Sequence, residues 1–372
     1  GPALHLTADH PVRRVRRRTR HLVEAEWVGA GRLREGDEIL LHDHRALQGW
    51  EGDHTEAEGY LIGLLIGDGV LKSDKAVLSV WAPELRSVAN GTVATEHLHS
   101  ASGIMEAALA AAATLPHRAD FRGWQRPIDG RGEFRMASGA LRRLALSLDL
   151  RPGHKTITPR IEQASSAFAC GLLRGLFDAD GSVQGSQDKG VSVRLTQSDP
   201  ELLAAVQRML LRLGIASTIY RERHPAGVRP LPDGRGGTGH YPTQAVHELV
   251  ISGDNLLVFD SRVGFTDTRK RERLDQALGA YRRALNREPF VATVARVDDA
   301  GTRTVYDVTV ADIHAFDANG LVVHNCGEQP LPAYGCCCLG SLDLTRFVRD
   351  PFTPQARFDE AAFAEVAAVA VR

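Results

Sequence analysis

The strongest constraint on the fold of this chain is an internal repeat. Two short apolar runs, LIGLLIGDG at 61–69 and LRGLFDADG at 173–181, share the same spacing of small and acidic residues. Each is followed by a similar stretch, DKAVLSV at 74–80 and DKGVSVR at 188–194. Further along, EFRMASGALRRLALSL at 133–148 resembles ELVISGDNLLVF at 248–259. These pairs predict two copies of one helix–hairpin–helix unit in the middle of the chain.

The two apolar runs predict helices that pack together and end side by side. The aligned positions are Gly63 with Gly175, Gly67 with Ala179, Asp68 with Asp180 and Gly69 with Gly181. Small residues four positions apart share a helix face and let two backbones approach closely. We expect the last glycine of each run to end its helix in a left-handed conformation.

An aspartate at the end of each helix is electrostatically unfavourable in the absence of a partner. Carboxylates there face the negative end of the helix dipole, and two of them ~4 Å apart repel by about 4 kcal/mol at an effective dielectric of about 20. A divalent cation turns this repulsion into a binding site, because hard oxygen ligands suit Mg²⁺. We therefore expect Asp68 and Asp180, together with Gly67 and Ala179, to hold Mg²⁺ that polarises a scissile phosphate and activates water. The alternative is two buried helices with surface aspartates as caps, and the matched pair of runs favours the metal site.

Residues 55–285 resemble the LAGLIDADG homing endonucleases in their single-chain, two-repeat form. The resemblance implies αββαββα repeats, a saddle of antiparallel strands over double-stranded DNA, and cleavage of both strands at a long site. The second motif is nearly complete. The first departs from the pattern at Ile66 and Gly67 and keeps Asp68.

Lys155 lies in HKTITPRI, shortly before the second acidic run. Endonucleases carried by inteins have a lysine in a similar block, so the resemblance implies that Lys155 stabilises charge or assists water near the metal. The alternative is a solvated lysine in a linker.

The stretch 191–196 predicts a strand with one polar face. Apolar Val191, Val193 and Leu195 alternate with polar Ser192, Arg194 and Thr196. The polar set either contacts DNA or forms an ordinary solvated face.

A second set of reactive residues lies in YDVTVADIHAFDANGLVVHNC at 306–326. The side-chain amide of Asn325 can attack its own backbone carbonyl, forming a succinimide and breaking the bond to Cys326. Histidines beside that carbonyl supply acid–base catalysis and stabilise the oxyanion, and the Cys326 thiol can accept an acyl group. Asn319 and Gly320 predict a tight hairpin just before this site.

Together with Thr7 and His10 of LTADHPV at 6–12, this stretch resembles the Hint-type splicing domain of inteins, whose two halves flank an inserted endonuclease. The roles that the resemblance implies are activation of the upstream scissile bond by Thr7 and His10, assistance to Asn325 by His314 and His324, and support of thiol exchange by Asp307. The alternative is a structural β-domain with hydrogen-bonded histidines.

Inteins begin with Cys or Ser, whereas this sequence begins with Gly1 and Pro2. We expect the first nucleophile to lie in an upstream remainder of the precursor, which then acts as a partner. This polypeptide would retain only asparagine cyclisation.

Residues 326–344, CGEQPLPAYGCCCLGSLDL, resemble the active-site block of ribonucleotide reductase large chains of the adenosylcobalamin-dependent type. After splicing, the resemblance implies a thiyl radical at Cys326 and assistance from Glu328, with adenosylcobalamin needed only by the intact host. The adjacent cysteines at 336–338 are poorly spaced for tetrahedral zinc. The chain has five cysteines, and this odd count argues against a disulfide framework.

The sequence therefore predicts an α+β architecture, a pseudo-symmetric two-repeat endonuclease inserted in an all-β Hint splicing domain. The expected parts are an N-terminal splicing part at 1–52, the endonuclease at 53–285, a C-terminal splicing part at 286–325 and a reductase fragment at 326–372.

No apolar run reaches the roughly 18 residues of a membrane span, so we expect a cytoplasmic monomer with no membrane partner. The expected DNA partner is the host gene without the insertion. A formal net charge of −1 does not decide for or against DNA. Two alternatives remain: a splicing element with a decayed nuclease that only binds DNA, and a chain that is simply a ribonucleoside-diphosphate reductase fragment.

Overall fold

The computed structural model describes residues 2–19, 22–81, 94–126, 132–186, 190–232, 237–281, 284–306, 308, 313–325 and 342–370. The chain divides into two compact units. The larger unit comprises residues 1–305 and 315–324, and the smaller unit comprises residues 306–314 and 325–372. Each unit is described by itself.

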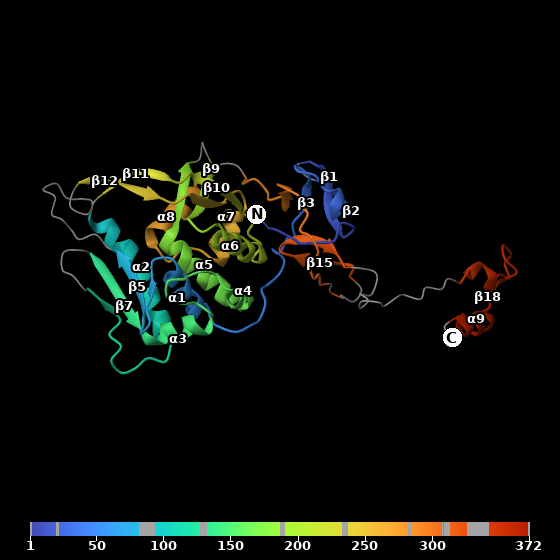
Figure 1. The fold of residues 1–372 in the computed structure, drawn as a ribbon, viewed down its shortest axis with the longest axis horizontal. Helices are drawn as coiled ribbons and strands as arrows, with labels where there is room; N and C mark the ends of the chain where they lie inside the picture. The colour runs from blue at the N-terminus through green and yellow to red at the C-terminus, as the bar shows by residue number, and fades with distance from the viewer. Residues whose placement is uncertain are drawn as a thin grey trace. The chain divides into compact units, whose positions relative to one another are not determined.

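The middle of the larger unit consists of two copies of the same arrangement (Figure 1). The first copy contains α1 (Glu56–Ile66), β4 (Val70–Leu71), β5 (Ala76–Trp81), α2 (Ala94–Ala113), β6 (Trp124–Gln125), β7 (Glu133–Ser138) and α3 (Gly139–Ser147). The second contains α5 (Ser166–Asp180), β8 (Gly181–Ser186), β9 (Gly190–Gln197), α6 (Pro200–Arg212), β10 (Thr218–His224), β13 (Val246–Ile251) and α7 (Asn255–Arg262). Three further pieces belong to this part: α4 (Pro159–Gln163), the hairpin of β11 (Gly227–Pro232) and β12 (Thr238–Thr243), and α8 (Thr268–Gly279). The two copies predicted from the repeat are confirmed, and so is the αββαββα order that the family resemblance implied.

The two sheets have matching strand orders, β4-β5-β7-β6 in the first copy and β8-β9-β13-β10 in the second. Their paired strands are antiparallel. On β9 the apolar residues Val191, Val193 and Leu195 are buried, as the alternation predicted. The segment pairs found in the sequence thus occupy equivalent places in the two sheets.

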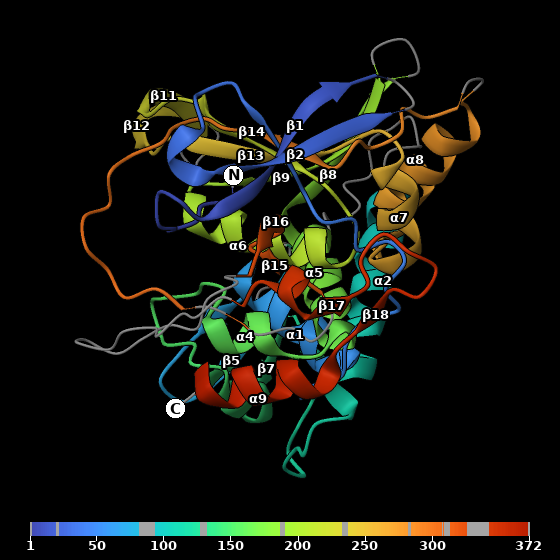
Figure 2. The ribbon, with the colours of Figure 1, turned by 90° about the vertical axis from the view of Figure 1, so that its right-hand side faces the viewer.

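Helices α1 and α5 lie side by side at the junction of the two copies, as both ribbon views show (Figures 1 and 2). Thr55 begins α1 with a reciprocal capping box to Glu58. Four glycines make the close crossing possible, because a Cβ on any of them would overlap the main chain of the opposite helix; they are Gly59 and Gly63 on α1 and Gly171 and Gly175 on α5. The close approach predicted from the small residues is confirmed.

The predicted left-handed helix ends are wrong. Gly181 has φ −78° and ψ 157°, and neither it nor Gly69 belongs to the glycines with positive φ. Glycine is needed there for space instead. A Cβ on Gly69 would lie 2.6 Å from the Cα of Leu65, and one on Gly181 would overlap the Phe177 carbonyl.

Strands from both ends of the larger unit form a second structure, which we call the terminal sheet. Its members are β1 (Pro11–Arg18), β2 (Val23–Gly29), β3 (Glu38–Leu40), β14 (Val291–Thr293), β15 (Ala315–Ala318) and β16 (Leu321–His324), with the 3-10 turn Ala30–Arg32 after β2. The order is β14-β3-β1-β16-β15, and β2 pairs with β1. In Figure 1 the blue and orange strands of this sheet lie together. Residues on either side of the repeat thus share one sheet.

The terminal sheet begins after a turn and contains the predicted hairpin. Strand β1 starts at Pro11, and in the turn before it the His10 N–H donates to the Thr7 carbonyl at 3.1 Å. The hairpin at Asn319 and Gly320 is confirmed, with positive φ of 52° and 87° at these residues and pairing of β15 with β16 on either side. Three of the seven residues of TVYDVTV at 304–310, at positions 307, 309 and 310, lie outside the described residues.

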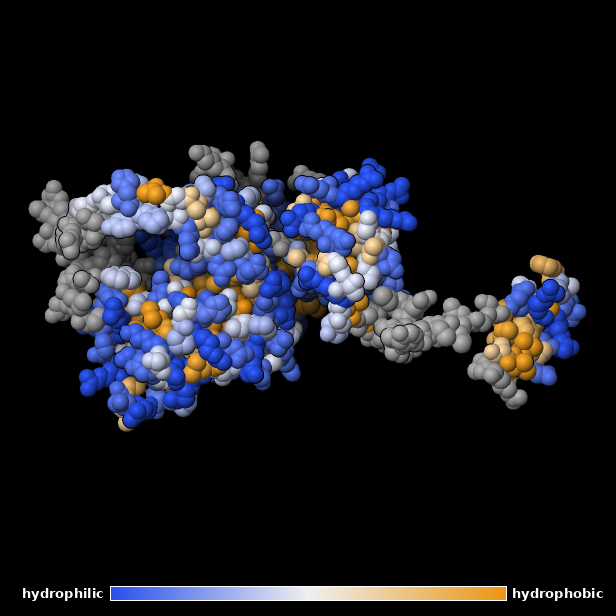
Figure 3. Space-filling model, in the orientation of Figure 1, coloured by the Kyte–Doolittle hydropathy of each residue, from blue (hydrophilic) through white to orange (hydrophobic). Residues whose placement is uncertain are grey.

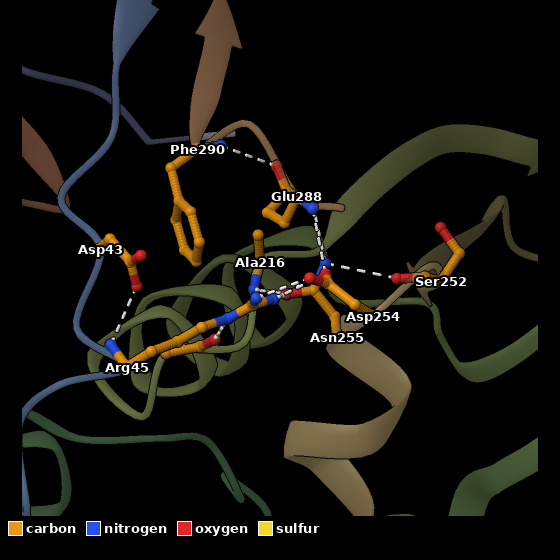
Figure 4. Close-up of polar contacts among 9 residues, drawn as sticks. Asp43, Arg45, Ala216, Ser252, Asp254, Asn255, Glu288 and Phe290 are labelled. Carbon is orange, nitrogen blue, oxygen red and sulfur yellow. Dashed lines mark hydrogen bonds and ion pairs between the residues drawn. The ribbon is translucent and has the colours of Figure 1, made fainter. Parts of the chain in front are cut away.

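A polar cluster joins the terminal sheet to the second copy (Figure 4). The Arg45 guanidinium donates to both Asp254 carboxylate oxygens at 2.8 Å, and it lies 4.9 Å from the centre of the Phe290 ring. Asp254 also accepts the Glu288 N–H at 3.0 Å, and Asn255 donates to the Glu288 carboxylate at 2.8 Å. The segment that leaves the terminal sheet and the segment that returns to it are therefore fastened to the start of α7.

The smaller unit contains the 3-10 turn Leu344–Phe347, β17 (Val348–Arg349), β18 (Arg357–Phe358) and the C-terminal helix α9 (Glu360–Ala370). Rings of Phe347, Phe358 and Phe363 form its contacts, with centroids 5.3 to 6.2 Å apart. Apolar side chains remain on its surface (Figure 3), and Val369 is 68% exposed. None of the described helices in either unit has the length and apolar character to cross a membrane.

Candidate functional site

The candidate site lies at the ends of α1 and α5. Asp180 is the last residue of α5, and Asp68 follows the end of α1 by two residues. A Cβ on Gly67 would lie 2.5 Å from the Ala179 Cβ and 3.4 Å from Asp180 Oδ2. The two helix ends are therefore in contact, and the predicted residues Asp68, Asp180, Gly67 and Ala179 lie at one place.

The two aspartates have different surroundings. Burial and then the charge of Asp68 raise the pKa of Asp180 above its ordinary value, and a hydrogen bond from Gln197 opposes this rise. That bond runs from Gln197 Nε2 to Asp180 Oδ2 at 2.6 Å. Asp68 is exposed to solvent. The pair thus has one solvated member and one partly enclosed member whose charge is costly without a cation.

Lys155 belongs to this site and not to a solvated linker. Its Nζ donates to the carbonyls of Gly67 at 3.1 Å and Gly69 at 2.5 Å. Burial lowers the pKa of Lys155, and the charges of Asp180 and Asp68 partly offset this fall by raising it. The ammonium group therefore lies at the negative end of α1, beside the acidic pair.

Lys270 is the equivalent residue for α5, and it was not predicted from the sequence. Its Nζ donates to the carbonyls of Phe177 at 3.1 Å and Asp178 at 2.5 Å. Burial lowers the pKa of Lys270, against the attraction of nearby carboxylates that include both members of the pair. The repeat held the signal, because Lys155 and Lys270 are 115 residues apart, as are the matched residues Glu133 and Glu248.

Asp178 positions the segment that carries Lys270. This buried carboxylate accepts hydrogen bonds from the main-chain N–H groups of Thr266 and Asp267 at 3.0 Å and from the Tyr60 hydroxyl at 2.9 Å. Burial raises the pKa of Asp178, while these hydrogen bonds oppose the rise. Asp267 caps α8, so Asp178 links the end of α5 to the start of the helix that bears Lys270.

The donor set fits a divalent cation that prefers oxygen. The helix ends bring together two carboxylates and the main chain beside them, which are hard ligands of the kind that Mg²⁺ takes. Gly67 has no side chain, and the space that its Cβ would fill lies against Asp180. Asp68 and Asp180 are the residues that would hold the ion.

The predicted DNA-facing residues on β9 differ in accessibility. Ser192 is only 6% exposed and accepts a hydrogen bond from Arg194 Nε at 2.9 Å. Arg194 also pairs with Glu248 at 3.0 Å, whereas Thr196 is exposed. Thr196 is therefore the most accessible of the three, and their role in DNA binding stays a prediction.

The residues predicted for splicing lie partly in the terminal sheet. Val12 of β1 is paired with Val323 of β16 in antiparallel register, which brings His10 and His324 to the same end of the sheet. The His324 ring packs edge-on against Trp27 with centroids 5.1 Å apart. His10 Nε2 is buried and has no hydrogen-bond partner among the residues that the structure describes. Thr7 lies in the turn before β1.

The remaining predicted residues belong to the smaller unit. The Asn325 N–H donates to the His314 carbonyl at 3.4 Å, and Asn325 is 7% exposed. Asp307, Cys326 and Glu328 lie outside the described residues, as do the cysteines at 336–338.

Comparisons with known proteins give a family match within the two-copy part of the chain. Residues 167–264 match the family described as LAGLIDADG-like domain. The chain is 26% identical over 321 residues to the ribonucleoside-diphosphate reductase NrdEB subunit alpha of Bacillus subtilis (strain 168), which covers 82% of this chain and 28% of that protein. It is 34% identical over 159 residues to a DNA polymerase of Thermococcus hydrothermalis, covering 41% of this chain and 9% of the polymerase. The chain thus spans less than a third of the length of either relative.

Among solved structures, the crystal structure of I-DmoI in complex with DNA and Mn is 20% identical, with a TM-score of 0.32, covering 56% of this chain and 96% of that chain. The matched family segment corresponds to the second copy, from α5 to α7. A LAGLIDADG-like domain is therefore present in the middle of the chain.

Proposed function

We propose that the two-copy part of this chain is a homing endonuclease that cuts both strands of DNA in the presence of a divalent cation such as Mg²⁺. The observation that carries the proposal is the glycine-lined crossing of α1 and α5, which brings Asp68 and Asp180 to one place. A half-buried, destabilised carboxylate beside another carboxylate is the electrostatic arrangement that a cation relieves.

Each residue of the site has a distinct part in the proposed reaction. Asp68 and Asp180 supply the negative charge that holds the ion, and Gln197 fixes the Asp180 carboxylate through its hydrogen bond. Lys155 and Lys270 place positive charge beside the scissile phosphates, where negative charge develops in the transition state. When bound, the divalent cation supplies Lewis-acid charge and lowers the pKa of water.

The sheets of the two copies supply the proposed DNA surface. On the second sheet the side chains opposite the core include Thr196 on β9 and Tyr220 on β10, which both pair in register with Glu248 of β13. Arg223 lies near the same carboxylate, with 3.6 Å between the charged atoms. Arg223 and the Tyr220 ring, both exposed, are suited to phosphate and base contacts.

A plasmid that carries a reductase gene without the insertion is the test substrate. With Mg²⁺ the protein should linearise it, and with EDTA it should not. Asp180→Asn should abolish cleavage while DNA binding persists, and Asp120→Asn, at a carboxylate 77% exposed on the surface, should cleave normally. Binding without cleavage by the unmodified protein would instead support a DNA-binding module with a decayed nuclease.

We propose in addition that the terminal sheet belongs to a Hint-type splicing domain. Strands from both sides of the nuclease pair within this sheet, and their register brings His10 and His324 to one end, next to Asn325 in the chain. In this proposal His10 and Thr7 activate an upstream bond, and His314, His324 and Asp307 assist cyclisation of Asn325 and exchange at Cys326. The products would be a chain that ends in a succinimide and a fragment that begins at Cys326.

Intact mass spectrometry after incubation tests this second activity. The parent chain should release the fragment that begins at Cys326, and Asn325→Ala should remain whole. His324→Gln should slow the release. A parent chain that stays intact at all times would contradict the cyclisation proposal and leave the nuclease proposal unaffected.

The names of the relatives support an insertion in a larger host. The matched stretches belong to a reductase and a DNA polymerase, proteins of different activity, and they cover a small share of each. We propose ribonucleotide reductase as the host, with Cys326 and Glu328 and the cofactor adenosylcobalamin acting only in the intact enzyme. Exposed apolar side chains on the smaller unit, such as Val366 and Val369, agree with a segment that packs against more of a host protein.

A further inference from the structure

Three metal-ligating side chains converge at one edge of the terminal sheet, away from the acidic pair. His42 and His44 follow β3, and Asp317 lies on the hairpin of β15 and β16. A main-chain bridge between Leu41 and Leu321, and a hydrogen bond from the His42 N–H to the Gly320 carbonyl at 2.8 Å, hold the two segments together. Residues two apart on an extended chain face the same side, so both imidazoles can reach the hairpin.

The distances suit coordination of one ion. His44 Nε2 lies 3.0 Å and His42 Nδ1 lies 3.7 Å from Asp317 Oδ2. One ligand atom from each residue lies within 4.8 Å of the other two. Metal–ligand bonds of about 2.0–2.1 Å in tetrahedral geometry separate neighbouring ligand atoms by roughly 3.4 Å. The two measured separations from the carboxylate oxygen bracket that value.

Burial and unused hydrogen-bonding capacity point to a ligand. His44 is 7% exposed, and its imidazole lies edge-on to that of His42 with centroids 4.2 Å apart. The Nδ1 atoms of both histidines are buried and have no hydrogen-bond partner among the described residues. A buried imidazole nitrogen without a partner destabilises the fold, and a cation at His42 Nδ1 removes that penalty.

Asp317 is already oriented for this role. Its Oδ1 accepts the Gly320 N–H at 2.7 Å inside the turn, which directs Oδ2 toward the two histidines. A carboxylate fixed by a main-chain hydrogen bond is a preorganised ligand.

We propose that His42, His44 and Asp317 form a binding site for a late first-row divalent cation, with Zn²⁺ as the expected occupant. Two imidazole nitrogens and one carboxylate oxygen favour zinc over magnesium, and three protein ligands leave a fourth position for water. The ion would link the segment that follows β3 to the hairpin of β15 and β16. Strand β16 of this hairpin ends at His324. The inference goes beyond the nuclease and splicing proposals and does not depend on either.

Cobalt titration of the full chain tests the site, because tetrahedral Co²⁺ absorbs visibly. The titration uses excess Mg²⁺ to occupy oxygen-rich sites, in a background where the cysteines at 326 and 336–338 are serine, so that the clustered thiolates near the C-terminus cannot bind. One equivalent of Co²⁺ should bind and be displaced by Zn²⁺. His42→Gln should weaken binding by at least about tenfold, and His54→Gln, at a histidine of the nuclease part, should leave it unchanged.

Asp317→Asn is the second variant, because asparagine keeps the oxygen that accepts the Gly320 N–H and removes the negative charge. It should also weaken Co²⁺ binding by at least about tenfold, with an unchanged circular dichroism spectrum. Equal affinity and stoichiometry in the parent, His42→Gln and Asp317→Asn would overturn the proposal. So would a parent chain that binds no Co²⁺.

Discussion

The ends of α1 and α5 are built on the same plan and yet place their aspartates in different electrostatic surroundings. Both helices end at a glycine-lined crossing, and at each end a lysine donates to main-chain carbonyls. Asp68 is exposed, whereas Asp180 is half-buried, bonded to Gln197, and has a raised pKa. Backbone symmetry therefore does not give the two aspartates equal surroundings.

The residue two places before each aspartate accounts for part of this difference. In α1 it is Ile66, which packs in the core, and in α5 it is Asp178, which holds the segment leading to α8. The second helix thus organises its own lysine through a buried carboxylate. The first helix receives Lys155 from the segment between α3 and α4 without such a link.

Replacing the aspartates gives the largest expected effect. Asp68→Asn and Asp180→Asn should each reduce double-strand cleavage by more than about 100-fold, because losses of that size follow even from weaker changes around a metal. The two variants should differ in stability. Since the folded-state pKa of Asp180 is raised, its charged form destabilises the metal-free protein at neutral pH. Asp180→Asn should therefore raise the Tm in EDTA more than Asp68→Asn does.

The glycine-lined crossing is the feature that the two helices share, and adding a methyl group there should destabilise the protein from either side. Gly63→Ala and Gly175→Ala should each reduce the free energy of unfolding by about 3 kcal/mol, because the new Cβ overlaps the main chain of the opposite helix. Urea denaturation measures this. Gly279→Ala in α8 is the control, since nothing lies within 4 Å of a Cβ there. Equal stability of all three variants would contradict the packing argument.

The lysines test whether each helix end serves one DNA strand. Lys155→Met and Lys270→Met should each slow cleavage by roughly 10- to 100-fold, since each removes one positive charge from the site. The two variants should accumulate nicked plasmid with the break in opposite strands. Strand-specific end labels identify the uncut strand. Nicks in the same strand for both variants would contradict the prediction that each helix end serves one DNA strand.

The smallest expected effect comes from Gln197. Its hydrogen bond opposes the rise in the pKa of Asp180, so Gln197→Leu should raise that pKa further. A carboxylate must lose its proton to bind the cation, so the acid limb of the pH–activity profile should move to higher pH. Activity at neutral pH should fall by less than about tenfold. In the metal-free Gln197→Leu variant, the free energy of unfolding should fall as the pH rises from the ordinary aspartate pKa to the raised pKa of Asp180. An unshifted profile would show that Gln197 acts elsewhere.

Local patterns in the sequence predicted much of the fold. Matched segments predicted the two copies, alternation predicted the buried side of β9, and Asn319 with Gly320 predicted the hairpin. Spacing of small residues also predicted that Asp68 and Asp180 would meet. These features depend on side-chain periodicity and turn chemistry, which are visible within a few residues.

Features that depend on distant residues were not predictable in this way. Arg45 meets Asp254 across 209 positions, and His44 meets Asp317 with no local pattern to connect them. Gly69 and Gly181 appeared to be left-handed caps, because the sequence cannot show how little space surrounds them. Lys270 could have been found from Lys155 by applying the 115-residue offset that separates Glu133 from Glu248.

The crossing of α1 and α5 also determines how the proposed nuclease activity can be lost. Four positions tolerate no atom beyond the main chain, so any amino-acid replacement of Gly59, Gly63, Gly171 or Gly175 pushes the two helices apart. The terminal sheet is built from other residues and does not share this requirement. Over generations, single mutations can therefore abolish the proposed DNA cutting while the strands at the two ends of the larger unit keep their pairing.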